Sequence, residues 1–222
     1  MIKAVIFDMY ETLITLFESP AYFGTQIAED MGINEIVFRK TWDGMEEKRS
    51  IGKISLEEVL ELIMRENHCY SMELLNRIAE KRMESKRECF KHMHAEIIPM
   101  LSELHKAGIK IGLISNCFYE EAVAIRESVL FPYFDAAYMS YEQGIQKPDK
   151  EIFIRCMKAL EASPQECIYI GDGGSHELEA AQELGMNTFQ ATWYLKDGTT
   201  QPVKRKEDFA QLDTPFEVLK YI

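Results

Sequence analysis

Short apolar runs that alternate with helical patterns constrain the fold of this 222-residue chain more than any other feature. Clear runs cover residues 2–7, 109–114, 134–139 and 167–170, and a weaker run covers 188–192. Runs of this kind are typical of buried strands in a parallel sheet, which is covered on both faces. The sequence therefore predicts four strands and a weaker fifth.

Helical patterns separate the later runs, and a glycine or a Ser-Pro pair often marks a boundary. The predicted helices cover residues 98–107, 120–130, 150–160 and 176–184. Strands that alternate with helices indicate βαβ units. We predict an α/β fold with a doubly wound, Rossmann-like parallel sheet. The polar segment 196–208 is predicted to be a surface loop before a short final helix.

The stretch from residue 19 to residue 90 has a different character, because its pattern is almost entirely helical and it is rich in Glu, Lys and Arg. Val59 and Ile63 are spaced for one helix face, and Ser55 with Glu58 forms a capping-box pattern. We predict a helical cap domain at 19–90, inserted into a core domain made of residues 1–18 and 91–222.

Two groups of side chains in this helical stretch have alternative interpretations. Phe38, Trp42 and Met45 lie at helical spacing, which favours the interior of the cap over a wall for the substrate. Arg39 and Arg49 could reach an anionic group on a substrate, but an exposed charged helix face is the favoured interpretation.

Composition excludes several classes of partner. The formal net charge is −12, which repels nucleic acid and anionic lipid, although a pocket can still bind a small anion. The chain has no apolar run near the ~18–20 residues that a membrane span needs and no signal-peptide pattern. The five cysteines are scattered and form no CxxC pair. We expect a soluble, cytoplasmic protein with reduced thiols.

Polar residues follow each predicted strand or the turn after it, where an open α/β sheet binds ligands. Asp8 follows the first run, Ser115 the second, Lys147 lies past the third, and Asp172 and Glu177 follow the fourth. These side chains would converge on one point. Such a set can attack an electrophile, bind an anion and hold a hard cation.

In order and spacing, these clusters resemble the four signature motifs of the haloacid dehalogenase-like (HAD) superfamily. Asp8 matches the nucleophilic aspartate and Ser115 the hydroxyl of the second motif. Lys147 matches the lysine of the third motif, and Asp172 and Glu177 match the acidic pair of the fourth. The resemblance covers the core, about two thirds of the chain, and the helical stretch stands where the family inserts its cap.

The resemblance implies a hydrolase that works through a covalent intermediate on Asp8, because covalent catalysis divides one hard step into two. It also implies Mg²⁺ as the cofactor, bound by Asp8, the backbone carbonyl of Tyr10 and Asp172. Glu177 would act through water or from outside the inner shell.

Four further residues have expected roles around the anion. Lys147 would position Asp8 and the phosphate, and Ser115 with the backbone N–H of Asn116 would bind phosphoryl oxygens. Thr12 would cap the turn after Asp8 and is grouped with Ser115 and Asn116 as a residue expected to bind substrate.

Tyr10 departs from the pattern of the phosphatases in this superfamily, which carry a second aspartate at that position as general acid and base. A phenol with a reference pKa near ~10 is a poor base at neutral pH. The 2-haloacid dehalogenases of the superfamily have tyrosine there, and a halide leaves without a proton. Glu11 could supply the missing acid if the turn directs it inward.

The acidic pair favours the opposite conclusion, because the 2-haloacid dehalogenases use no metal and lack the acid that Asp172 matches. Three carboxylates without a cation would repel one another and blunt the nucleophile. We therefore expect a Mg²⁺-dependent phosphatase that acts on a small phosphorylated metabolite. The alternatives are a 2-haloacid dehalogenase and a catalytically weak module that binds anions in regulation.

Overall fold

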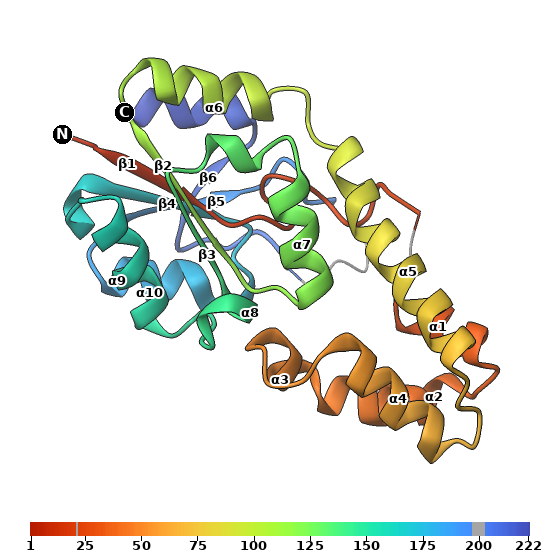
Figure 1. Ribbon diagram of the computed structural model, residues 1–222. Helices are drawn as coiled ribbons and strands as arrows, with labels where there is room; N and C mark the ends of the chain where they lie inside the picture. The colour runs from red at the N-terminus through yellow and green to blue at the C-terminus, as the bar shows by residue number, and fades with distance from the viewer. Residues whose placement is uncertain (21, 197–202) are drawn as a thin grey trace.

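The computed structural model describes residues 1–20, 22–196 and 203–222. It contains one six-stranded sheet in the order β3-β2-β1-β4-β5-β6, and all strand pairs are parallel (Figure 1). The strands are β1 (Ala4–Phe7), β2 (Lys110–Ser115), β3 (Ala136–Met139), β4 (Cys167–Gly171), β5 (Asn187–Ala191) and β6 (Ala210–Leu212). The doubly wound parallel sheet that the sequence predicts is confirmed.

The register of the central strand places the site. Phe7, the last residue of β1, lies beside Leu113 of β2 and Ile170 of β4. The chain builds β2 and β3 on one side of β1 and then returns to build β4 on the other side. The residues after β1, β2 and β4 therefore meet at the switch in strand order, where ligands bind in open α/β sheets.

The two faces of the sheet are covered by different helices. Val5 and Phe7 point into one apolar cluster, and Ala4 and Ile6 point into the other, because side chains alternate along a strand. Figure 1 shows α6 and α7 on one side of the sheet and α9 and α10 on the other. These helices are α6 (Ile97–Lys106), α7 (Tyr119–Glu127), α9 (Lys150–Ala159) and α10 (Glu177–Glu183).

Short elements complete the core. They are α8 (Ser140–Gln143) and the 3₁₀ helices η1 (Cys89–Lys91), η2 (Phe131–Tyr133), η3 (Pro164–Glu166), η4 (Gly174–His176) and η5 (Pro215–Tyr221). The loop predicted at 196–208 lies partly outside the described residues, and β6 follows it in place of a direct connection to the last helix. The sequence interpretation missed β6 because its three residues, Ala-Gln-Leu, form no apolar run.

Residues 24–88 form a separate group of helices, which we call the helical block. Its helices are α1 (Gly24–Met31), α2 (Glu35–Gly44), α3 (Glu46–Ser50), α4 (Leu56–Glu66) and α5 (Met72–Glu88). In Figure 1 the block stands apart from the sheet, and α5 leads back to the core, where it packs against α7.

The helical block has its own apolar interior, which includes Phe38 and Trp42, while Met45 packs against it partly buried. This agrees with the predicted interior position of the three side chains. The capping box of α4 is present: Glu58 N donates to Ser55 Oγ at 3.0 Å, and Ser55 N donates to Glu58 Oε2 at 2.8 Å.

The two arginines of the helical block differ from each other. Arg39 is exposed and pairs with Glu35 at 2.7 Å, as expected for a charged helix face. The favoured interpretation of Arg49 as exposed is wrong, because its side chain is 2% exposed. Its guanidinium is stacked against the rings of Trp42 and Phe118, which remove it from water.

All five cysteines are free thiols. Within the described ranges, no helix is both long and apolar enough to cross a membrane.

Candidate active site

Asp8 and Lys147 form the centre of the site. Asp8 follows β1 directly, and its backbone N–H donates to the carbonyl of Ile170 at 2.9 Å, which fixes the residue against β4. Lys147 Nζ lies 2.6 Å from Asp8 Oδ1 and also contacts Glu177 directly. The structure thus brings together three of the predicted residues from distant parts of the chain.

Asn116 positions Lys147 through two hydrogen bonds. Its side-chain amide donates to the carbonyl of Lys147 at 2.9 Å, and the backbone N–H of Lys147 donates to Asn116 Oδ1 at 2.8 Å. Asn116, predicted to bind substrate through its backbone, therefore also holds the lysine loop against the end of β2. Asn116 also lines a cavity at this edge of the sheet.

The acidic pair of the fourth motif faces Asp8. Carboxylate oxygens of Asp8, Asp172 and Glu177 all lie within 4.8 Å of one another. Glu177 Oε2 accepts from the Tyr169 hydroxyl at 2.8 Å, and Glu177 Oε1 accepts from the backbone N–H of Gly173 at 3.2 Å. Glu177 is thus already bound from several sides.

Gly171 makes room for that arrangement. A Cβ at this position would lie 2.0 Å from Glu177 Oε1 and 2.6 Å from its carboxyl carbon, which is closer than atoms can approach. The last residue of β4 must therefore lack a side chain so that Glu177 can approach the strand end.

The charges of the site are strongly perturbed. Burial raises the pKa of Asp8 to about 7, helped by Glu177 and opposed by Lys147. Burial also raises the pKa of Asp172 to about 8, with further contributions from Glu177 and Asp8. Three carboxylates face one ammonium group here, so a bound cation would lower the repulsion between them.

Three buried hydroxyls near the ends of β1 and β2 have no hydrogen-bond partner within the described residues: Tyr10 Oη, Thr12 Oγ1 and Ser115 Oγ. The prediction that the Thr12 side chain caps the turn is therefore wrong; its carbonyl instead accepts from Trp193 Nε1 at 2.8 Å. Buried polar groups normally have partners, so unpaired ones at a site suggest that a ligand supplies them.

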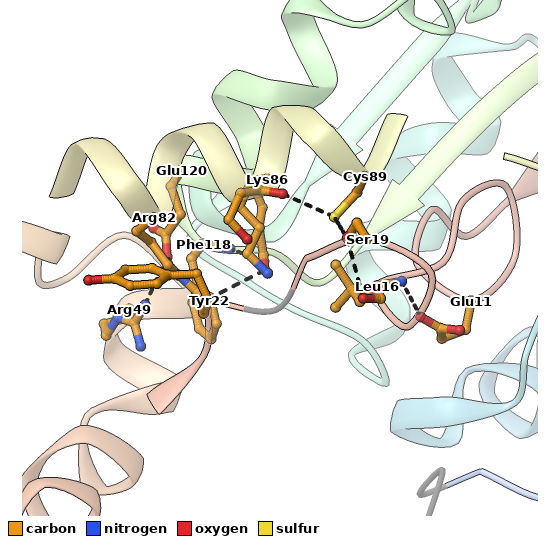
Figure 2. A network of polar contacts seen from close by, with 12 residues as sticks. Glu11, Leu16, Ser19, Tyr22, Arg49, Arg82, Lys86, Cys89, Phe118 and Glu120 are labelled. Carbon is orange, nitrogen blue, oxygen red and sulfur yellow. Dashed lines mark hydrogen bonds and ion pairs between the residues drawn. The ribbon is translucent and has the colours of Figure 1, made fainter. Parts of the chain in front are cut away.

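The loop after Asp8 does not offer Glu11 as a free acid. Its carboxylate accepts from Thr15 Oγ1 at 2.7 Å. It also accepts from the backbone N–H of Leu16 at 2.8 Å (Figure 2). Both oxygens are engaged inside the loop. Burial keeps the pKa of the Tyr10 phenol well above its usual value, so that hydroxyl stays protonated.

Two adjoining cavities open at this edge of the sheet. One of about 800 Å³ contains Asp8, Asp172 and Lys147, and the other, of about 650 Å³, extends from Tyr10 and Lys147 toward the helical block. The sequence interpretation missed several residues of the site. Tyr169 was counted only as part of an apolar strand, although its hydroxyl donates to Glu177. The other missed residues line the cavities: His176, Glu46 and residues 203–206.

Comparisons with known proteins agree with this geometry. A family model described as haloacid dehalogenase-like hydrolase matches residues 2–185. The glyceraldehyde 3-phosphate phosphatase of Methanopyrus kandleri is 25% identical over all of this chain and 97% of its own length. The enzyme of the same name from Methanocaldococcus jannaschii is 32% identical, but the match covers 41% of this chain and 40% of that protein.

Solved structures show the same fold at low sequence identity. A HAD family enzyme of Bacteroides thetaiotaomicron in complex with magnesium and inorganic phosphate is 20% identical, with a TM-score of 0.68 over 91% of this chain and 98% of that one. A 2-haloacid dehalogenase of Pseudomonas syringae is also 20% identical, with a TM-score of 0.68 over 99% and 97%. With the family match covering most of the sequence, the chain belongs to the haloacid dehalogenase-like hydrolases.

Proposed function

We propose that this hydrolase is a Mg²⁺-dependent phosphatase that hydrolyses a small phosphate monoester through a phosphoryl group carried by Asp8. The observation that carries the proposal is the group of three buried carboxylates, Asp8, Asp172 and Glu177, within 4.8 Å of one another. The name of the full-length Methanopyrus relative and the magnesium and phosphate complex of the Bacteroides enzyme support it.

The donor set fits Mg²⁺, which prefers carboxylate and carbonyl oxygens. Asp8, Asp172 and the backbone carbonyl of Tyr10 would hold the ion. Glu177 would act outside the inner shell, because Lys147, Tyr169 and Gly173 already occupy its oxygens. Mg²⁺, when bound, supplies positive charge that offsets the charge of the carboxylates and the phosphoryl oxygens.

Asp8 would perform the chemistry in two steps. Lys147 holds Oδ1, so Oδ2 is the oxygen that attacks phosphorus while the bond from phosphorus to the alcohol oxygen breaks. Water then attacks the phosphoryl group, releases inorganic phosphate and restores the carboxylate. The unpaired hydroxyl of Ser115 and the backbone N–H of Asn116 would donate to phosphoryl oxygens during both steps.

Tyr10 would shape which substrates react well. Its phenol stays protonated and makes no hydrogen bond to another described residue, so it offers no base to the attacking water.

The residues at 19–90 would act as the cap that selects the alcohol part of the substrate. Their helices form one wall of the 650 Å³ cavity through residues of α2 and α3, Asp43, Glu46, Glu47 and Ser50.

A second candidate is 2-haloacid dehalogenation, which Tyr10 favours because a halide leaves without a proton. Asp172 opposes it, because two buried carboxylates side by side repel each other when no cation is bound: burial, Glu177 and Asp8 together raise the pKa of Asp172 to about 8. A third candidate is a binding module without turnover, which any measured hydrolysis excludes.

Trapping of the covalent intermediate tests the proposed function. The protein is mixed with ³²P-labelled acetyl phosphate and Mg²⁺, quenched in acid and digested, and the labelled peptide is identified. We expect the label on the peptide that contains Asp8, and no label in the Asp8→Asn variant, which keeps the shape but loses the charge. Label elsewhere, or equal label in the variant, would remove Asp8 from the covalent role.

A further inference from the structure

A second group of buried charges lies between the helical block and the core. Arg82 and Lys86 project from α5, and Arg49 comes from α3 (Figure 2). We call these three residues the cation cluster; they are 2% (Arg49), 4% (Arg82) and 1% (Lys86) exposed. Their partners, Glu120 and Glu121, lie in the first turn of α7 and are also buried.

The cluster is not balanced by its partners. Arg49 and Arg82 both reach Glu120 Oε1, at 3.0 Å each, and Lys86 Nζ lies 2.7 Å from Glu121 Oε1. Three cations therefore share two carboxylates, and one positive charge has no buried counterion in the described part of the chain. A buried charge without a counterion is strongly unfavourable.

The excess positive charge is most evident at Arg49. Its guanidinium carbon lies 3.8 Å from the ring centre of Trp42 and 4.0 Å from that of Phe118. Its Nε is buried and donates to no other described residue. Glu46 lies nearby on the rim, but it is exposed, so water screens its charge.

The cluster lines a cavity that continues the catalytic one. This cavity, of about 250 Å³, shares Phe118 and Glu121 with the 650 Å³ cavity that contains Tyr10 and Lys147. Lys86 Nζ lies 5.8 Å from the ring centre of Tyr10. Helix α1 begins at Gly24 on the wall of the same cavity, so the positive end of its dipole adds to the field there.

We propose that the cation cluster binds a second anionic group of the substrate. The substrate class is then a short phosphate ester that also carries a carboxylate or a second phosphate. Its phosphoryl group lies at Asp8 while the distal anion accepts a hydrogen bond from Arg49 Nε and supplies the missing negative charge. This inference rests on the proposed phosphatase function and specifies its substrate.

Matched pairs of esters test the inference. In the first pair, 3-phosphoglycerate carries a carboxylate where glycerol 3-phosphate carries a hydroxymethyl group. In the second pair, propane-1,3-diol bisphosphate carries a second phosphate where 3-hydroxypropyl phosphate carries a hydroxyl group. For the wild type with Mg²⁺, we expect kcat/KM to be at least about tenfold higher for the anionic member of one pair, since charge-assisted hydrogen bonds are strong. The pair that shows the preference identifies the anion.

Variants link the preference to the cluster. Lys86→Met should lower kcat/KM more for the ester with the second anionic group than for its matched partner. The ratio of the two kcat/KM values should therefore fall about tenfold. Arg87→Gln is the matched control: Arg87 also joins α5 to α7, through Glu127 at 2.7 Å, but it is exposed and outside the cavity. Its ratio should equal that of the wild type. If Lys86→Met does not fold, Lys86→Gln, which removes the positive charge but keeps a polar group for Glu121, takes its place.

A ratio near one in the wild type would overturn the inference, and so would an unchanged ratio in the folded Lys86 variant. Failure of the proposed function looks different, because then no ester is hydrolysed. In that case calorimetry of the same esters with the wild-type protein decides, and equal Kd values within each pair would overturn the inference.

Discussion

Lys147 Nζ lies 2.6 Å from Asp8 Oδ1 and at the same time contacts Glu177, so one buried ammonium group joins two carboxylates. The proximity of the carboxylates raises the pKa of Lys147 above its usual value despite the burial that opposes it. Three elements that are far apart in sequence are thereby joined at the end of β1.

Lys147→Met should lower the free energy of unfolding by about 3–5 kcal/mol, because it leaves Asp8 and Glu177 buried without their cation. Urea denaturation at pH 8 without Mg²⁺ measures the loss. The control is Lys150→Met, whose partner Glu183 lies 2.8 Å away at the surface, with side chains 48% and 64% exposed. That change should cost no more than about 1 kcal/mol. Equal losses in the two variants would contradict the central role of Lys147.

Gly171→Ala should displace Glu177, because the new Cβ would lie 2.0 Å from its Oε1. We expect a loss of about 1–3 kcal/mol in stability, as for other overpacked sites, and a fall in activity. Gly44→Ala is the matched control, since a Cβ there meets nothing within 4 Å. Its stability should stay the same or rise by up to about 1 kcal/mol, because alanine favours helix. A fully active Gly171→Ala enzyme would show that the position of Glu177 does not matter.

Stability without metal should fall as pH rises through the site's titration. Asp8 and Asp172 have folded pKa values of about 7 and about 8, above their values in the unfolded chain. Their contribution is therefore fully present below about pH 4 and is lost as pH rises through 7 and 8. Between pH 4 and pH 8, the free energy of unfolding of the wild type should fall by roughly 2 kcal/mol or more relative to that of Asp172→Asn.

Under the proposed function Mg²⁺ would bind the ionised carboxylates, so it should raise the wild-type Tm more at pH 8 than at pH 6. Thermal unfolding at both values, with Mg²⁺ and with EDTA, measures the difference. Equal shifts at pH 6 and pH 8, or none, would contradict a metal site at Asp8 and Asp172.

Tyr10→Asp tests the missing general acid. The wild type should favour p-nitrophenyl phosphate and acyl phosphates, whose leaving groups need little protonation, over alkyl phosphates by ~10²–10⁴-fold. The variant should restore alkyl phosphate hydrolysis at least about tenfold and change the activated substrates little. A wild type that is already fast on alkyl phosphates would mean that another acid donates the proton. Loss of a 2-haloacid activity in the variant would support dehalogenation.

Much of the fold could be predicted from the sequence because the information is local. The strand at residues 4–7 and the strand at 167–171 are short apolar runs bounded by polar residues, and parallel sheets bury such runs on both faces. The meeting of Asp8 with Asp172 also follows, because both come directly after neighbouring strands. Lys147 is also predicted there, on the turn past the third strand, and the family resemblance then suggests its role.

Other features depend on tertiary contacts that a pattern does not contain. Arg49 reads as a surface residue by its type, but two rings and Glu120 bury it. Thr12 reads as a cap, yet its hydroxyl is left unpaired among the described residues while its carbonyl binds a distant tryptophan. Tyr169 lies in an apolar strand, and only the fold shows that its hydroxyl reaches Glu177.

Mg²⁺-dependent phosphoryl transfer on Asp8 can be tested with one assay of the wild-type enzyme. A panel of phosphate monoesters and 2-haloacids is incubated with Mg²⁺ and, separately, with EDTA, while released phosphate and released halide are measured. We expect phosphate release that EDTA abolishes, and no halide release. Halide release that EDTA leaves unchanged, with no phosphate from any ester, would contradict it.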